Sequence, residues 1–283
     1  MMIAQITDLH IRPPGKRAYG VVESNDMLAA TVEAINSLPR LPDVVIATGD
    51  LTDCGLPSEY AELRRILSAL EMPVYLVPGN HDRRAELFEA FGADGYFPDD
   101  GAFLHYVVED NDVRLIGLDS VVPGAGHGRM CEARLRWLDE RLAEERDRPT
   151  LVFMHHPPFS TGLAAMDDIN CRDGGRMADV IRRYNHVERV VCGHHHRPIV
   201  TRWAGTIGSV APSTAHQVTL HLAPGDEPST FTMEPPAYQL HVWNEAAGLI
   251  SHTAYVGAFA GPYPFVLDDD YPGHEKVTAA ETA

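Results

Sequence analysis

The chain has few cysteines, no long apolar run and a shortage of basic residues. Its four cysteines among 283 residues stand far apart, at positions 54, 131, 171 and 192, and form no C-x-x-C pair. This spacing argues against a zinc ribbon, and we expect reduced thiols that mainly pack. No stretch approaches the ~18 apolar residues of a membrane span. The first apolar run leads directly into Asp8, which leaves no room for a removable leader. We therefore expect a cytoplasmic protein without a membrane partner.

The excess of acidic residues limits the kinds of molecule that we expect this chain to bind. Lysine and arginine number 23 against 40 aspartates and glutamates, a formal net charge of −17. Proteins that bind extended nucleic acid usually present a basic face, so we expect none here. A small anionic substrate is still compatible, because bound divalent cations would make a local site positive on an acidic body.

Short apolar runs alternate with helical patterns along the first two thirds of the chain. Six runs rich in β-branched residues predict buried strands at 2–6, 44–47, 74–77, 113–118, 150–154 and 190–192. Apolar residues at helical spacing predict helices at 24–38, 58–70, 132–145 and 174–184, the second with a cap at Ser58. This alternation predicts an α/β fold.

The pattern changes near residue 199. Short β-like runs follow, at 217–222, 230–233 and 239–243 among others, punctuated by proline and glycine and without a strong helical pattern. We divide the chain into a core at 1–198, a β-rich segment at 199–256 that either continues the sheet or forms a small cap, and a polar C-terminal tail at 257–283.

Seven polar residues stand in five short blocks, D-L-H, G-D, G-N-H-D, H-H-P-P and G-H-H-H, each behind an apolar run. They are Asp8, His10, Asp50, Asn80, His155, His194 and His196. Ligands in open α/β sheets gather beyond the carboxyl ends of the strands, so these blocks are expected to converge. If strand geometry persists past residue 6, Asp8 and His10 point the same way, as do His194 and His196, with His195 facing away.

The donor set suits transition metals. Two carboxylates, four imidazoles and one amide fit Zn, Mn, Fe or Co better than Ca. Seven ligands are too many for one ion, and two ions sharing a carboxylate need about this number. We expect Asp50 to be the carboxylate that the two ions share, because its block supplies a single ligand and lies between two blocks that supply two ligands each. Glycine precedes a ligand at positions 49, 79 and 193, which allows a sharp turn or a close approach to the ions.

Each block alone has an ordinary explanation. D-x-H occurs by chance, G-D and N-H mark turns, H-H-P-P fits a proline-fixed loop, and G-H-H-H fits a surface patch. The order of all five, each behind an apolar run, favours a metal centre with two divalent ions.

Five segments carry a resemblance to a known family. They are Y-G at 19–20, C-G-x-P-x-E-Y at 54–60, Y-L-V-P-G-N-H-D at 75–82, F-M-H-H-P-P at 153–158 and H-Q-V at 216–218. With the metal blocks, they make the chain similar over nearly its whole length to calcineurin-like metallophosphoesterases. Within that family it resembles bacterial glycerophosphodiesterases and class III cyclic-nucleotide phosphodiesterases.

The resemblance implies a four-layer α/β/β/α sandwich with a small β-rich cap that mediates homo-oligomerisation and partly covers the site. It also implies how the ligands divide. The first metal would be held by Asp8, His10, Asp50 and His196. The second would be held by Asp50, Asn80, His155 and His194.

A two-metal centre lowers the pKa of a bound water and clamps the attacking and leaving oxygens. We therefore expect a metal-bound hydroxide to attack phosphorus in a small diester. His81, beside Asn80, is a candidate catalytic residue that stabilises the phosphoryl oxygens or protonates the leaving alkoxide; the alternative is that it orients a ligand. Candidate substrate-binding residues are His216, Tyr19 and His127, although His216 could equally line a hairpin.

The second block favours a diester. Related protein phosphatases have G-D-x-x-D-R-G there, with an arginine that grips a dianionic monoester, whereas this chain has Cys54 in that place. Arg83 and Arg84 could compensate. Glycerophosphodiesters are the favoured substrates, 3′,5′-cyclic nucleotides are the alternative, and a non-catalytic scaffold of the same fold is a third possibility that retention of all seven residues disfavours.

Overall fold

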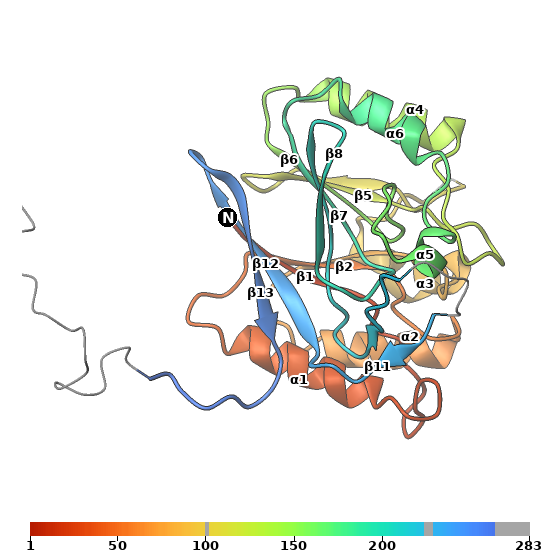
Figure 1. Cartoon of the computed structure of the whole chain (residues 1–283), viewed down its shortest axis with the longest axis vertical. Coiled ribbons are helices and arrows are strands. Elements are labelled where there is room, and N and C mark those ends of the chain that lie inside the picture. The colour runs from red at the N-terminus through yellow and green to blue at the C-terminus, as the bar shows by residue number, and fades with distance from the viewer. Residues whose placement is uncertain (100–101, 224–228, 264–283) are drawn as a thin grey trace, which may run out of the picture.

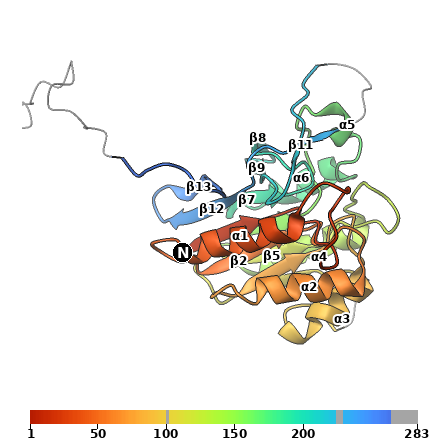
Figure 2. The same cartoon turned by 90° about the horizontal axis from the view of Figure 1, so that it is seen from below.

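Two mixed β-sheets lie face to face, with helices on both outer sides (Figures 1 and 2). The computed structural model describes residues 1–99, 102–223 and 229–263. The five-stranded sheet has the order β13-β12-β1-β2-β3 and the six-stranded sheet the order β4-β5-β6-β7-β9-β8. Strands β1 to β3 are parallel to one another, as are β5, β6, β7 and β9.

The strands of the five-stranded sheet are β1 (Met2–Ile6), β2 (Val44–Thr48), β3 (Val74–Val77), β12 (Ala237–Asn244) and β13 (Gly248–Tyr255). Those of the six-stranded sheet are β4 (Tyr106–Val108), β5 (Arg114–Leu118), β6 (Thr150–Met154), β7 (Val187–Cys192), β8 (Ile199–Trp203) and β9 (Thr206–Val210). Strands β1, β2, β5 and β6 are buried on both faces, which explains why they appear in the sequence as continuous apolar runs.

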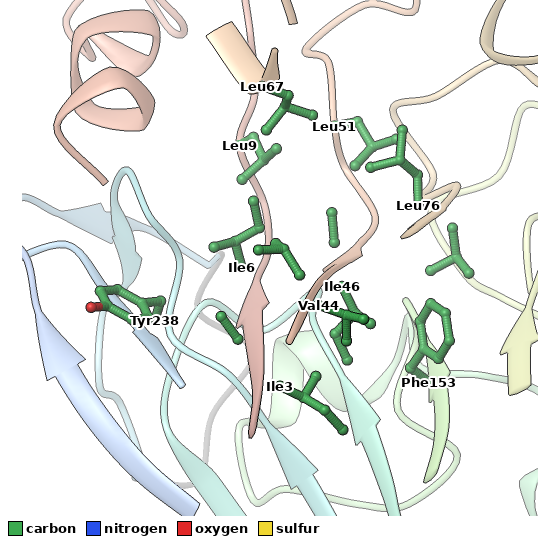
Figure 3. Packing of buried hydrophobic residues seen from close by; sticks show 14 of the residues in the cluster. Ile3, Ile6, Leu9, Val44, Ile46, Leu51, Leu67, Leu76, Phe153 and Tyr238 are labelled. Atoms are coloured by element: carbon green, nitrogen blue, oxygen red, sulfur yellow. The ribbon is translucent and has the colours of Figure 1, made fainter. Parts of the chain in front are cut away.

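Each sheet is covered by its own helices. Helices α1 (Ser24–Asn36), α2 (Pro57–Leu67) and α3 (Arg84–Phe91) pack on the five-stranded sheet, while α4 (Glu132–Glu144) and α6 (Gly174–Ile181) cover the six-stranded one. The sheets also pack on each other, with Phe153 of β6 facing Val44 and Ile46 of β2 (Figure 3). These four layers confirm the α/β/β/α sandwich.

The six predicted strands are confirmed, with shifts of at most three residues at their ends. The four predicted helices are also present. Helix α2 begins one residue early because Pro57 occupies its first turn and the Glu59 carboxylate accepts hydrogen bonds from the Cys54 and Leu56 backbone N–H groups. The predicted cap at Ser58 was therefore wrong. Helix α3, strand β4 and the single-turn helix α5 (Ala164–Asp167) were not anticipated.

Residues 199–256 divide among three structures. Strands β8 and β9 extend the six-stranded sheet, and β12 and β13 extend the five-stranded one. Only β10 (Gln217–Val218) and β11 (Phe231–Thr232) stand apart, as a two-stranded ribbon near α5 (Figure 2). The predicted tail contains no helix or strand at 257–263, and 264–283 lies outside the described residues. None of the described helices is both long and apolar enough to cross a membrane.

Candidate metal centre

All five polar blocks lie where strands end. Asp8 follows β1, Asp50 follows β2 and Asn80 follows β3, while His155 and His194 follow β6 and β7 of the facing sheet. Because β1 to β3 run parallel, as do β6 and β7, the blocks meet at one edge of the sandwich. The topology thus brings together residues that are up to 188 positions apart in the sequence.

The backbone at this edge is not extended, so the argument from strand alternation was wrong. Five proposed ligands have left-handed backbone geometry. Their φ values are 52° at Asp8, 45° at His10, 46° at Asp50, 71° at His194 and 49° at His196. This conformation costs an L-residue roughly 1–2 kcal/mol. Its repetition at one place is typical of a functional site that the surrounding fold holds under strain.

A first group of ligand atoms comes from Asp8, His10, Asp50 and His196. One side-chain N or O atom of each lies within 4.8 Å of the others. His196 Nε2 is 3.1 Å from Asp8 Oδ1 and 3.4 Å from His10 Nε2, and His10 Nε2 is 3.9 Å from Asp50 Oδ2. All four side chains are buried.

A second group adjoins the first through the same oxygen. His155 Nε2 lies 3.3 Å from Asp50 Oδ2 and 3.1 Å from Asn80 Oδ1. The ring centroid of His194 is 5.0 Å from that of His155. Asp50 Oδ2 therefore faces imidazoles of both groups, while Asp50 Oδ1 accepts a hydrogen bond of 2.9 Å from the His81 backbone N–H.

Outward hydrogen bonds fix how the four imidazoles face the centre. In each ring, one nitrogen contacts an oxygen acceptor and carries a proton, so in the neutral ring the other nitrogen has a lone pair. These contacts are His10 Nδ1 to Asp53 Oδ1 (3.3 Å), His155 Nδ1 to the Thr48 carbonyl (2.8 Å), His194 Nε2 to the Ile169 carbonyl (3.1 Å) and His196 Nδ1 to the His216 carbonyl (2.9 Å).

In this arrangement, hydrogen-bond acceptor atoms face other acceptor atoms. The Nε2 lone pairs of His10 and His196 face each other at 3.4 Å, and the lone pair of His155 faces carbonyl and carboxylate oxygens at 3.1 and 3.3 Å. With neutral rings, such contacts are unfavourable unless a cation lies between them; without a bound cation, protonated imidazoles make the same contacts, as the raised pKa values of His155 and His196 indicate. Neutral imidazoles and ionised carboxylates are also the protonation states that bind metal. The residues present therefore fit divalent transition-metal ions.

The charges of the buried groups at the centre also favour bound cations. Burial alone would raise the pKa of Asp50, but the imidazoles of His155 and His81 outweigh it and hold the pKa well below its usual range. Burial likewise lowers the pKa of His155, but the Asp50 carboxylate outweighs it and raises the pKa to about 9. The buried carboxylates therefore favour positive charge beside them.

Two glycines allow the chain to approach these carboxylates closely. A Cβ atom at Gly193 would lie 2.1 Å from Thr7 Oγ1 and 2.8 Å from Asp8 Oδ2. A Cβ atom at Gly79 would lie 2.2 Å from Asp50 Oδ1. Only glycine fits at either position without displacing a carboxylate.

The candidate catalytic residue His81 lies at the rim of the centre. Its Nδ1 atom donates to the Asp53 carbonyl at 2.8 Å, so its Nε2 atom is the one left free, 4.0 Å from Asp50 Oδ2. The side chain is 31% exposed and lines the cavity over the metal-ligand residues. It is thus placed to touch a substrate as well as a ligand.

The three predicted substrate-binding residues do not all gather at the site. Tyr19 and His216 lie together, with ring centroids 5.2 Å apart, and both line the cavity over the centre. His127 is half-buried, has Arg129 and Arg172 as its electrostatic neighbours, and lines neither cavity that adjoins the centre. His195 faces away, as predicted, and its ring nitrogens contact Asn170 and Thr161.

The region around Cys54 contains a cation that sequence reasoning missed. Arg12 Nη1 contacts Cys54 Sγ at 2.7 Å, but it also binds the buried Glu59 carboxylate at 2.6 Å. Arg84, considered above as a compensating cation, is instead paired with the buried carboxylate of Asp119. Both guanidinium groups are therefore neutralised within the protein.

Asp82, the last residue of the G-N-H-D block, joins two of the ligand loops. Its carboxylate accepts five hydrogen bonds between 2.8 and 3.2 Å. The donors are the backbone N–H groups of Leu51, Thr52 and Gly79 and the hydroxyls of Thr52 and Tyr60. Asp82 thus fixes the loop carrying Asp50 against the loop carrying Asn80. The G-N-H-D block contains this residue, but nothing in the sequence shows which backbone groups it binds.

Comparison with known proteins agrees with this centre and with the fold. The sequence model of the calcineurin-like phosphoesterase family matches residues 1–198, and the chain belongs to that family. It is 41% identical over 266 residues to a protein of Arcobacter nitrofigilis named "probable glycerophosphodiester phosphodiesterase", covering 94% of this chain and 97% of that one. It is 37% identical over 262 residues to a protein of Rhodopseudomonas palustris named "probable cyclic nucleotide phosphodiesterase", covering 89% and 91%.

A solved structure supports the architecture alone. The fold is similar to that of a dimetal phosphatase from Danio rerio, with a TM-score of 0.60 and 17% identity over 91% of this chain and 99% of that one. The resemblance inferred from the motifs is confirmed by the family match and by the two relatives.

Proposed function

We propose that the protein is a binuclear metal-dependent phosphodiesterase that hydrolyses small phosphodiesters, with glycerophosphodiesters favoured. The observation that carries this proposal is the pair of ligand groups that share one Asp50 oxygen. The name of the Arcobacter nitrofigilis relative, which this chain covers almost completely, supports the choice of substrate.

The first ion would be held by Asp8, His10, Asp50 and His196, and the second by Asp50, Asn80, His155 and His194. Two divalent ions at such a site activate water and offset the charge of the phosphate. The donor set fits Zn, Mn, Fe or Co. Asn80 supplies a neutral amide oxygen where the first group has a second carboxylate, so the second ion is the more weakly held.

The residues around the ions perform the remaining steps. The Asp53 carbonyl holds His81 so that its free Nε2 faces the substrate, where it stabilises the phosphoryl oxygens or delivers a proton to the leaving alkoxide. Tyr19 and His216 line the same cavity as His81 and would limit the size of the bound ester. Arg12 and Arg84 are already paired with carboxylates and add little charge for a dianionic monoester, whereas Arg83 lines the cavity beside Asn80 and His81.

A second candidate is a 3′,5′-cyclic-nucleotide phosphodiesterase, which the name of the Rhodopseudomonas palustris relative favours. It uses the same centre and differs in the ester that the cavity accepts. A cytoplasmic location, and assembly into a homo-oligomer through the β-rich segment 199–256, remain predictions.

A substrate panel with defined metals tests the proposal. The metal-free protein is loaded in turn with Zn, Mn, Fe or Co and assayed with bis(p-nitrophenyl) phosphate, p-nitrophenyl phosphate, glycerophosphoethanolamine and 3′,5′-cyclic AMP. We expect diesters to be cleaved with a higher kcat/KM than the monoester. The two candidates are separated by the ratio of kcat/KM for glycerophosphoethanolamine and cyclic AMP. Absence of diester cleavage with every metal would contradict both.

A further inference from the structure

An apolar cavity adjoins the cavity over the metal centre. It measures about 170 Å³ and is lined by residues of helix α5 and of the β10–β11 ribbon and its flanks. Four residues line both cavities, namely Met166, Val218, Ser229 and Thr230. The two cavities are therefore neighbours that share these side chains.

The chemistry of this space is almost uncharged. Among the described residues that line it, none carries a carboxylate, an ammonium or a guanidinium group, and Leu163, Met166 and Val218 form its buried apolar floor. A substituent with a positive charge, such as an amine, would find no carboxylate among these described residues. The lining favours a neutral group that gains from leaving water.

Three rings line the cavity over the metal centre itself. Phe231 of β11 lies 5.4 Å from Tyr19 and 4.9 Å from His216, measured between ring centroids. Tyr19 is 48% exposed and Phe231 is 37% exposed, although both are large and apolar. The rings come from three segments of the chain, and together they present part of an aromatic surface to the solvent beside the metal centre.

The ribbon holds Phe231 in place over the centre. Val218 and Phe231 pair across β10 and β11, and the Thr219 backbone N–H donates to the Thr230 carbonyl at 2.8 Å. The Ser229 hydroxyl also contacts Met166 Sδ at 3.4 Å, which joins the ribbon to α5. Phe231 is therefore positioned by backbone pairing and not by its own packing alone.

The opposite side of the centre has a different chemistry. Beyond Asn80 and His81 lies a larger cavity of about 700 Å³, whose lining includes Arg83 and Glu86. A phosphodiester carries two substituents, and this centre adjoins one cavity with charged side chains and one lined by the rings of Tyr19, His216 and Phe231. The two sides thus suit two unlike substituents.

We propose that the aromatic side is a subsite for a planar aromatic substituent of the phosphodiester, and that Phe231 determines this specificity. The inference rests on the proposed phosphodiesterase function. A flat ring can stack on the exposed part of Phe231 or Tyr19 while the phosphate remains at the ions, and such stacking requires no hydrogen-bond partner. Phe231 contributes little to the binding of a small aliphatic diester.

Phe231→Ala tests the subsite, with Phe259→Ala as the matched control. Phe259 is also a phenylalanine and is 64% exposed, but it follows β13 and lines neither cavity. Each variant is assayed with two aromatic diesters, bis(p-nitrophenyl) phosphate and 3′,5′-cyclic AMP, and with the aliphatic glycerophosphoethanolamine. Metal content is measured in parallel.

We expect Phe231→Ala to lower kcat/KM for the aromatic diesters about tenfold, mainly through KM, as loss of one stacking contact predicts. The aliphatic diester should change less than twofold, the metal content should be unchanged, and Phe231→Trp should restore aromatic turnover. An equal loss for aromatic and aliphatic diesters, or no loss for either, would overturn the subsite while leaving the phosphodiesterase proposal intact. Wild-type protein that cleaves no diester would overturn both.

Discussion

Replacement of Asp82 by asparagine should loosen the fold and the second metal site together. The Asp82 carboxylate lies between two ligand loops and accepts five hydrogen bonds, two at Oδ2 and three at Oδ1. Asparagine keeps one acceptor and replaces the other by an NH₂ group. Whichever way the amide points, at least two buried donors then face another donor.

The cost follows from these contacts. Each buried donor left without an acceptor costs roughly 1–3 kcal/mol, and the lost bonds were made to a charged group. We therefore expect Asp82→Asn to lower the free energy of unfolding by about 3–5 kcal/mol, on the order of 10 °C in Tm for a chain of this size. The loop carrying Asn80 is also released, so the affinity for the second ion should fall roughly 10- to 100-fold.

Two further variants provide an intermediate loss of stability and a control. Tyr60→Phe removes one of the five donors and leaves the Arg83 backbone N–H, which Tyr60 accepts at 2.9 Å, without its partner, so we expect a loss of about 1–2 kcal/mol. Asp179→Asn changes a carboxylate whose side chain is 76% exposed and should stay within about 0.5 kcal/mol of wild type. Urea unfolding and metal titration supply the measurements. An Asp82→Asn variant as stable as Asp179→Asn would refute the reasoning.

Three further predictions concern other parts of the molecule. Gly193→Ala would place a methyl group 2.1 Å from the Thr7 hydroxyl oxygen, so it should destabilise the fold and reduce metal binding. Gly175→Ala is the control, because a methyl group there meets open space in helix α6 and should leave the protein equally or slightly more stable. Thermal unfolding measures both. Burial lowers the pKa of His241 to about 3, below its unfolded value of 6.5, so the stability it contributes is present above pH 6.5 and is lost as the pH falls towards 3. His241→Gln should therefore lose less free energy of unfolding than the wild type between pH 7 and pH 5, by up to about 2 kcal/mol. Urea unfolding at several pH values measures this difference. The same pH dependence in both proteins would contradict it. Asn80→Ala should weaken the second metal, while His81→Ala should lower turnover with both metals retained, and metal loss from His81→Ala would remove it from the catalytic residues.

The sequence predicts the strands of this fold better than it predicts the backbone of the site. Runs such as 2–6 and 150–154 are buried on both faces, so composition alone marks them. The strand pattern also predicted extended backbone at Asp8 and His10, and this was wrong because both residues adopt positive φ immediately after the strand. Such strain is imposed by tertiary contacts, which local sequence does not encode.

The partners of charged residues are equally hidden from sequence. Arg84 is close to Asn80 in the chain and was considered as a phosphate-binding group, yet Asp119, 35 positions away, neutralises it. Arg12 reaches Cys54 and Glu59 from a loop with no recognisable motif. Motifs locate the metal ligands because those positions constrain residue type, whereas pairing between distant loops depends on how the two sheets pack.

The most direct test of the account is the metal stoichiometry of diester hydrolysis. Metal-free protein is titrated with Mn or Zn while bis(p-nitrophenyl) phosphate cleavage is followed, beside His155→Ala, which removes a ligand of the second group only. The account predicts that wild-type activity appears fully only near two equivalents, and that His155→Ala binds one ion tightly and has little activity. Full activity at one equivalent, or cleavage unaffected by loss of His155, would contradict a centre in which two ions share Asp50.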